Sequence, residues 1–213
     1  MAARLTLWET LLRRALALID SAREVVDKPL TDWTLGGGTV LMLRHHHRFS
    51  KDIDIFVPDP QWLGYFTPRL SDTAQSMTTD YVESGNSLKL VFEEGEIDFV
   101  ASAPLTDDPW KSEVLVGREI RVETSAEIIA KKVWHRGDMF TARDIFDLAM
   151  VCEKDPGALP GIQPILSGKR DAILARVESN ERALRESFEA LDVLEYKRTF
   201  DECVKLVRDS LGK

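Results

Sequence analysis

The sequence contains little cysteine and no long apolar run, and both absences exclude classes of protein. Two cysteines, Cys152 and Cys203, occur in 213 residues. They are too few for a disulfide framework, and they lack the spacing of zinc ligands. No stretch approaches the roughly 18 apolar residues that a membrane-spanning helix needs. The amino terminus runs into amphipathic sequence without the apolar core of a signal peptide. We therefore expect reduced thiols, no membrane segment and a cytoplasmic protein.

An excess of positive charge is also absent. The chain has 28 lysines and arginines against 36 aspartates and glutamates, which gives a formal net charge of −8. A protein that coats nucleic acid without specificity carries the opposite balance. Any bound nucleic acid must therefore be held by a local basic patch. Hydrophobic content of 44% and charged content of 30% are those of an ordinary globular protein with one large or two small domains.

Hydrophobic periodicity predicts a mixed first half and a helical second half. The first half contains an amphipathic helix from Leu5 to Val26, a break at Asp27–Pro29, and a short strand that leads through glycines into a helix from Val40. Further strands are predicted at 52–57, 88–92, 96–101, 114–116 and 120–122, with a turn at 94–95, and helices at 125–136 and 141–152, followed by two or three charged helices. The expected fold class is α+β, a small mixed sheet with flanking helices (1–122) followed by a helical domain (123–213).

Two aspartates are predicted to lie side by side on the strand at 52–57. Residues two apart on a strand share a face, so Asp52 and Asp54 point the same way while Ile53 and Ile55 face the core. Ionised carboxylates that are close repel each other unless a cation lies between them, and Mg²⁺ is commonly held by one or two carboxylates plus substrate phosphates. Asp98, on a strand that alternates in the same manner, is the candidate third carboxylate, for a second metal or for accepting a proton.

A glycine turn precedes the paired aspartates. Gly36, Gly37 and Gly38 are followed by Thr39 and then by a predicted helix. A strand, a glycine-rich turn and a helix leave free backbone N–H groups that bind an anion. Amides, a hydroxyl and carboxylates for a metal are the parts that phosphoryl transfer requires. The combination therefore predicts a magnesium-dependent nucleotidyltransferase.

These segments resemble a known family. The stretch from Leu35 to Leu41, followed by the Arg-x-Ser-x-Asp-x-Asp pattern from Arg48 to Asp54, is similar to the nucleotidyltransferase fold of the DNA polymerase beta superfamily. More narrowly, it resembles the AbiEii/AbiGii toxin family. The segments Ile128–Trp134 and Arg143–Leu148 resemble that family's helical lysine motif and its Arg-Asp-x-x-Asp-Leu motif. The matching blocks span about residues 33–150, and the last sixty or so residues match only as generic helices.

The resemblance implies roles for individual residues and for partners. Asp52 and Asp54 would bind Mg²⁺, and Asp98 corresponds to the superfamily's third carboxylate, at a position where the narrower family varies. The predicted nucleotide-binding residues are Gly37, Gly38, Thr39, Arg48 and Ser50. Lys132 would neutralise phosphate charge with Asp144 as its acidic partner. Lys131 would replace Lys132 if the helix register shifted by one, and Asp147 shares a face with Asp144 and is the alternative to it.

A cationic stretch beside the glycine turn has two interpretations. Arg48 either contacts the acceptor or triphosphate or belongs to a solvated helix end. For the histidines His45, His46 and His47 we expect the solvated end. Neighbouring helical positions diverge, so these three side chains cannot all face one metal ion.

The expected function is transfer of a nucleoside monophosphate from an NTP to an acceptor hydroxyl. The family resemblance implies a toxin of a toxin–antitoxin or phage-defence pair, with an antitoxin partner and RNA, such as the tRNA 3′ end, as acceptor. One alternative keeps the chemistry and changes the acceptor to a protein side chain or a small molecule such as an antibiotic. Another is a regulatory module that binds NTP without transferring it.

Overall fold

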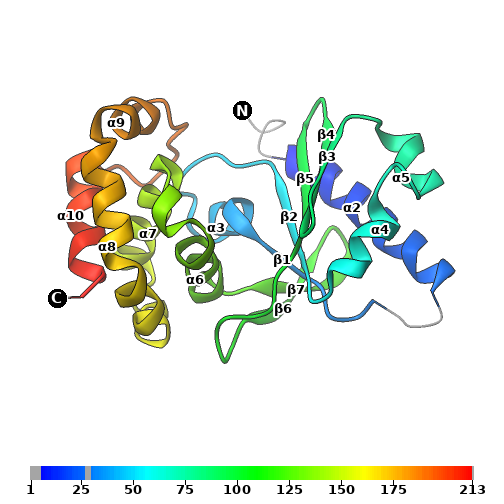
Figure 1. Ribbon diagram of the computed structural model, residues 1–213, viewed down its shortest axis with the longest axis horizontal. Coiled ribbons are helices and arrows are strands. Elements are labelled where there is room, and N and C mark those ends of the chain that lie inside the picture. The colour runs from blue at the N-terminus through cyan, green and yellow to red at the C-terminus, as the bar shows by residue number, and fades with distance from the viewer. Residues whose placement is uncertain (1–5, 27–29, 213) are drawn as a thin grey trace. The chain divides into compact units, whose positions relative to one another are not determined.

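A seven-stranded mixed sheet organises the first half of the chain in the computed structural model, which describes residues 6–26 and 30–212 (Figure 1). The strand order is β3-β4-β5-β2-β1-β7-β6. Two neighbouring pairs, β2 with β5 and β1 with β7, are parallel, and the other pairs are antiparallel. The strands are β1 (Thr34–Gly36), β2 (Ile53–Val57), β3 (Tyr81–Glu83), β4 (Ser87–Phe92), β5 (Gly95–Ala101), β6 (Trp110–Leu115) and β7 (Arg118–Glu123).

One face of β2 and β5 is covered by helix α2 (Leu7–Val25), which packs against both strands (Figure 1). Ile53, Ile55 and Phe99 are fully buried, as the period-two pattern predicts for a face packed on a helix. The short helices η1 (Pro60–Trp62), α4 (Leu63–Phe66) and α5 (Asp72–Met77) follow β2. Phe66 of α4 stacks on Phe99 with ring centroids 4.3 Å apart. The polar side chains of β2 and β5 therefore lie on the opposite face.

The chain divides into two compact units. Unit 1 takes the residues up to 40, together with 50–103 and 110–123, and contains the sheet. Unit 2 takes 41–49, 104–109 and the residues from 124 onward. The sequence analysis assigned 41–49 and 104–109 to the first domain. Helix α3 (Gly37–His45) begins in unit 1 and ends in unit 2.

Unit 2 is built around helix α7 (Ala142–Lys154), against which α9 (Glu181–Glu189) and α10 (Phe200–Ser210) pack. Thr141 caps α7 in a capping box with Asp144, and Thr124 caps α6 through the backbone N–H of Glu127. Phe146 of α7 contacts Phe188 edge to face in the aromatic core. The other elements of this unit are α6 (Ser125–Arg136), η2 (Gly137–Met139), η3 (Pro156–Ala158), η4 (Pro160–Ile162), α8 (Gln163–Ser179), α9 (Glu181–Glu189) and α10 (Phe200–Ser210).

The predicted fold class, a mixed sheet with flanking helices followed by a helical region, is confirmed. Several boundaries differ. The predicted strand at 114–116 runs from Trp110 to Leu115, because Val116 and Gly117 have φ values of 47° and 82° and form the hairpin turn. The turn predicted at 94–95 lies at 93–94, since Phe92 pairs with Gly95.

Other elements differ by a few residues or were not predicted. Helix α3 begins at Gly37 and not at Val40, and Thr141 is the cap of α7 and not its first residue. Strand β3 and helices α4 and α5 were missed. Leu5 and the predicted break at Asp27–Pro29 lie outside the described residues. Within the described part of the chain, no helix combines the length and apolar character needed to cross a membrane.

Candidate functional site

A row of polar residues crosses the sheet of unit 1 on the face opposite α2. Asp54 of β2 pairs directly with Asp98 of β5, and Asp98 pairs in turn with Lys89 of β4. On the other side, Asp54 is opposite Gly36 of β1. Side chains of directly paired residues lie on the same face of the sheet, and neighbouring strands are about 4.7–4.9 Å apart. The register therefore places two of the three predicted carboxylates side by side.

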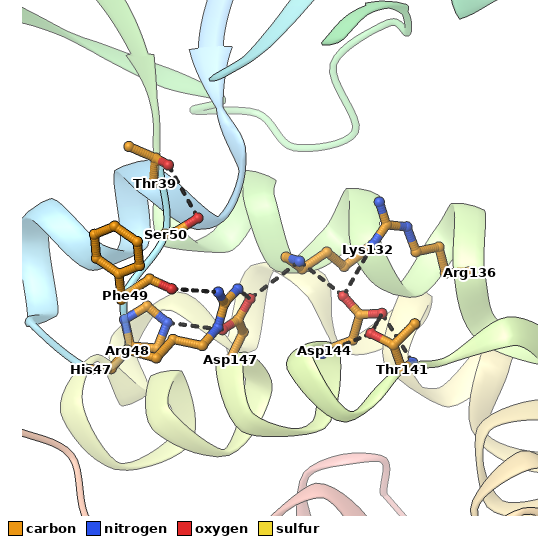
Figure 2. Close-up of polar contacts among 10 residues, drawn as sticks. All are labelled: Thr39, His47, Arg48, Phe49, Ser50, Lys132, Arg136, Thr141, Asp144 and Asp147. Carbon is orange, nitrogen blue, oxygen red and sulfur yellow. Dashed lines mark hydrogen bonds and ion pairs between the residues drawn. The ribbon is translucent and has the colours of Figure 1, made fainter. Parts of the chain in front are cut away.

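The third predicted carboxylate, Asp52, directly precedes β2. Its Oδ1 accepts a hydrogen bond from the backbone N–H of Glu96, at 3.0 Å. Its carbonyl oxygen accepts a hydrogen bond from the Thr39 hydroxyl at 2.6 Å, and that hydroxyl also lies 3.1 Å from Ser50 Oγ (Figure 2). Thr39 is fully buried. The Thr39 side chain therefore ties the glycine turn to the carboxylate strand.

Gly37 makes room for Asp54. A Cβ atom at Gly37 would lie 1.8 Å from Asp54 Oδ2, and the φ of Gly37 is +75°. Both the close approach and the left-handed backbone require glycine. The glycine turn and the aspartate pair, which the sequence analysis joined by motif alone, are thus in direct contact in unit 1.

Asp98 is half-buried and has a cation beside it. Burial raises the pKa of Asp98 above its ordinary value; the charge of Lys89 opposes this shift, while those of Glu96 and Asp52 add to it. Nζ of Lys89 lies 3.4 Å from Asp98 Oδ2 and also donates a hydrogen bond to Glu96. Burial lowers the pKa of Lys89, but the hydrogen bond to Glu96 and the charge of Asp98 outweigh burial and raise it.

The donor set suits a hard divalent cation. Carboxylate oxygens are the ligands that Mg²⁺ prefers, and it commonly takes one or two of them together with substrate phosphates. Because Gly37 has no side chain, there is space beside Asp54 Oδ2, and a Cβ atom at position 37 would fill it. Over residues 6–26 and 30–212, no group of three His, Cys, Asp or Glu side chains converges as a metal site. The residues of unit 1 therefore fit a cation held by two carboxylates and completed by phosphate oxygens.

Arg48, a predicted nucleotide contact, is buried in unit 2. It is 4% exposed, and its Nε and Nη2 donate to the two oxygens of Asp147, at 2.7 and 2.8 Å (Figure 2). His47 is fully buried and its Nε2 lies 2.8 Å from Asp147 Oδ1. The expected solvated helix end is therefore wrong for His47, and burial excludes the solvated one of the two interpretations given for Arg48. An internal carboxylate on α7 attracts them, and sequence spacing does not reveal it.

The same carboxylate reaches Lys132 of α6. Nζ of Lys132 lies 2.8 Å from Asp144 Oδ1 and 3.2 Å from Asp147 Oδ2 (Figure 2). Lys131 faces elsewhere, with its Nζ 3.4 Å from Glu127 Oε1. The structure thus joins Lys132, and not Lys131, to both aspartates of the Arg-Asp-x-x-Asp segment.

Charge compensation holds this unit 2 cluster in its ionised form. Burial alone would raise the pKa of Asp147, but Arg48, Lys132 and His47 outweigh burial and hold the pKa well below its ordinary value. Burial likewise opposes ionisation of Asp144, while Lys132 and Arg136 lower its pKa. Burial lowers the pKa of Lys132, and the two aspartates raise it above the ordinary value. Each buried charge has partners of opposite sign, as a low-dielectric interior requires.

Comparison with protein families decides the identity of these motifs. The model of the nucleotidyl transferase AbiEii toxin, a type IV toxin–antitoxin system, matches residues 24–210. The chain belongs to the AbiEii family. The match extends beyond the blocks quoted in the sequence analysis and includes the carboxy-terminal helices. The predicted family and the predicted enzyme class, nucleotidyltransferase, are confirmed.

Two solved structures share the fold. One, from H. pylori and assigned to the nucleotidyltransferases, has 15% identity and a TM-score of 0.50 and covers 94% of this chain and 92% of that chain. The other is MenT4, a nucleotidyltransferase toxin from Mycobacterium tuberculosis H37Rv, with 16% identity, a TM-score of 0.52, and coverage of 98% of this chain and 83% of that chain. A comparison with curated proteins finds no match.

Membership in the AbiEii family implies an NTP substrate and an antitoxin partner, and enzymes of this kind generally use divalent metals. Sequence analysis missed Lys89 in this AbiEii chain and assigned no charge partner to Asp98. Leu88 and Leu90 of β4 are buried, and this alternating pattern predicts that Lys89 lies on the polar face of the sheet. The turn was predicted one residue too late in the sequence, and that position would have placed Lys89 opposite Val100 and not opposite Asp98.

Proposed function

We propose that this AbiEii enzyme transfers a nucleoside monophosphate from an NTP to an RNA hydroxyl, in particular at a tRNA 3′ end, with Mg²⁺ held by Asp52 and Asp54. The observation that carries the proposal is the contact between the glycine turn and the carboxylate row, with Asp54 Oδ2 seated against Gly37 and Asp98 alongside Asp54. A phosphate-binding turn and carboxylates at such close range are what phosphoryl transfer requires.

In the proposed reaction, the acceptor oxygen forms a bond to the α-phosphorus of the NTP. The bond from that phosphorus to the bridging oxygen breaks, pyrophosphate carries away the electron pair, and the hydroxyl proton goes to a carboxylate. A bound divalent cation would neutralise charge on the phosphate oxygens. Backbone amides at Gly37 and Gly38 and the backbone of Thr39 would orient the phosphates. Asp98, whose pKa burial raises, suits proton acceptance.

Lys132 and Asp144 enter the proposal through the family motif, as the phosphate-neutralising lysine and its acidic partner. Arg48 and Asp147 support them from within unit 2, since Asp147 binds both Arg48 and Lys132. Ser50 contributes through its contact with the Thr39 hydroxyl.

A basic and aromatic surface on unit 2 supports RNA as the acceptor. Trp134 of α6 is 51% exposed, and Nζ of Lys169 on α8 lies 5.4 Å from its ring centroid. Burial lowers the pKa of His135, and the cations Lys131, Arg136 and Lys169 lower it further. Exposed aromatic rings among cations stack unpaired bases and bind phosphates. In the proposal, this surface serves as the local basic patch that an acidic protein needs for binding nucleic acid.

The test is incubation of the purified chain with each α-³²P-labelled NTP, Mg²⁺ and total tRNA. We expect label on RNA, and loss of at least a hundredfold in rate for Asp52→Ala and Asp54→Ala, as for removal of key electrostatic groups elsewhere (about 10²–10³). Asp80→Ala, which removes an exposed carboxylate directly before β3, is the matched control. Label on protein or on a small molecule would select those acceptors. NTP binding without turnover on any acceptor would contradict the enzymatic proposal.

A further inference from the structure

Lys89 lies at the end of the carboxylate row in unit 1. Its Nζ contacts Glu96 through a hydrogen bond and lies 3.4 Å from Asp98 Oδ2. Its side chain is 37% exposed, so the ammonium lies at the surface of the sheet and not within the core. On the other side of Asp98, the directly paired residue is Asp54. Asp98 is therefore positioned between a fixed cation and a predicted metal ligand.

The charges on this face limit how many cations it can hold. Asp52, Asp54, Glu96 and Asp98 supply up to four negative charges, and Lys89 already neutralises part of the charge on Glu96 and Asp98. A divalent ion bound to Asp98 would have to displace the ammonium or accept it as a close neighbour. At the same separation, a divalent ion repels the ammonium twice as strongly as a second unit charge would.

We propose that Lys89 is a built-in counter-cation that excludes a divalent ion from Asp98, so that this face binds one divalent ion, through Asp52 and Asp54. The inference rests on the proposed function, because it takes those two aspartates as the metal ligands. A lysine is suited to act as this counter-cation, because its ammonium is a compact point charge that competes with a metal ion for a carboxylate. Lys89 is thereby a positioning residue, which holds Asp98 through an ion pair.

The test is a titration of the full chain with Mn²⁺, in which free Mn²⁺ is measured by electron paramagnetic resonance and binding heat by calorimetry. The wild type should bind one ion per chain. Lys89→Met, which keeps the aliphatic stem and removes the charge, should bind two. Lys89→Arg keeps the charge and should bind one. Lys111→Met removes a lysine charge from β6 of the same unit and is the matched control, with one ion expected.

A second pair of variants tests which aspartates hold the ion, and its result does not depend on whether Lys89→Met folds. Asp98→Asn should leave the single ion and its affinity within about twofold of wild type, whereas Asp54→Asn should abolish binding. Two ions on the wild type, one ion on a folded Lys89→Met protein, or loss of the ion in Asp98→Asn would each overturn the inference while leaving nucleotidyl transfer intact. No Mn²⁺ binding by the wild type would overturn it together with the metal assignment of the proposed function.

Discussion

At the scale of single residues, the contact between Gly37 and Asp54 joins the two sequence motifs. The glycine turn and the Asp-x-Asp strand are separated by fifteen or so positions, yet Asp54 Oδ2 occupies the space that a Cβ at Gly37 would need. The turn is thus shaped around a carboxylate. The absence of a side chain at Gly37 therefore makes room for the carboxylate of Asp54.

Replacing Gly37 with alanine tests that contact. The new Cβ would lie 1.8 Å from Asp54 Oδ2, at a φ of +75° that alanine tolerates poorly. Strain of this kind costs about 1–3 kcal/mol, so we expect a lower midpoint of unfolding and loss of nucleotidyl transfer. Gly85→Ala is the control, because nothing lies within 4 Å of a Cβ at Gly85. Wild-type transfer rates in Gly37→Ala would show that Asp54 does not need this position.

At the scale of elements, α7 holds a buried charge cluster. Asp147 on α7 binds Arg48 and His47 from the segment after α3 and Lys132 from α6. These partners lie far apart in sequence, and the cluster joins the segment after α3 to α6 and α7. Removing one partner of a buried pair leaves the others without compensation, and the cost is large for that reason.

The stability of Asp147→Asn measures this cluster. We expect a loss of about 3–5 kcal/mol in the free energy of unfolding at pH 7, by urea denaturation. The folded-state pKa of Asp147 is below its ordinary value of 3.8. Its charge therefore stabilises the fold fully above that value, and this contribution is lost as the pH falls through the folded-state pKa. The difference from wild type should accordingly shrink below about pH 4.

A surface carboxylate serves as the comparison for this prediction. Asp171 on α8 has a side chain that is 98% exposed and lies 3.9 Å from the guanidinium of Arg170. Exposed pairs contribute little, so Asp171→Asn should change stability by less than about 1 kcal/mol at any pH. If Asp147→Asn behaved in the same way, the cluster would not stabilise unit 2.

At the scale of the whole molecule, the net charge of −8 restricts how the proposed RNA acceptor could bind. A protein with this balance repels a polyanion everywhere except at a local patch. The patch proposed around Trp134 and Lys169 offers few cations, so RNA bound there would have few of its phosphates contacted. The logarithm of the binding constant falls by about 0.7 per phosphate for each tenfold rise in salt. We expect a shallow slope of about 2–3, measured by filter binding of tRNA at several salt concentrations.

Trp134→Ala should weaken tRNA binding about tenfold or more, because stacking of a base on an aromatic ring is worth about 1–3 kcal/mol. Trp110→Ala is a close control, since Trp110 is also exposed (37%) and also has a cation, Arg121, over its ring at 4.4 Å. Equal effects of the two substitutions would mean that RNA does not use this surface of α6 and α8.

Local patterns in the sequence determined the elements and the family. Alternation of Ile53 and Ile55 with Asp54 defined the carboxylate strand, and helical periodicity predicted helices at 125–136 and 141–152, close to α6 and α7. Such signals are local because they depend on backbone geometry within a few residues. The motifs that predicted the nucleotidyltransferase family are likewise short segments of contiguous sequence.

Contacts between distant segments were decided by the tertiary structure alone. The pairing of Asp98 with Lys89 depends on a strand register, and a one-residue error in the position of a turn changes which residues are opposite each other. The burial of Arg48 depends on Asp147, ninety-nine positions away. Charge alone predicts a solvated arginine. A buried ion pair forms only where the fold brings both charges to one place, and that place is a property of the packed chain.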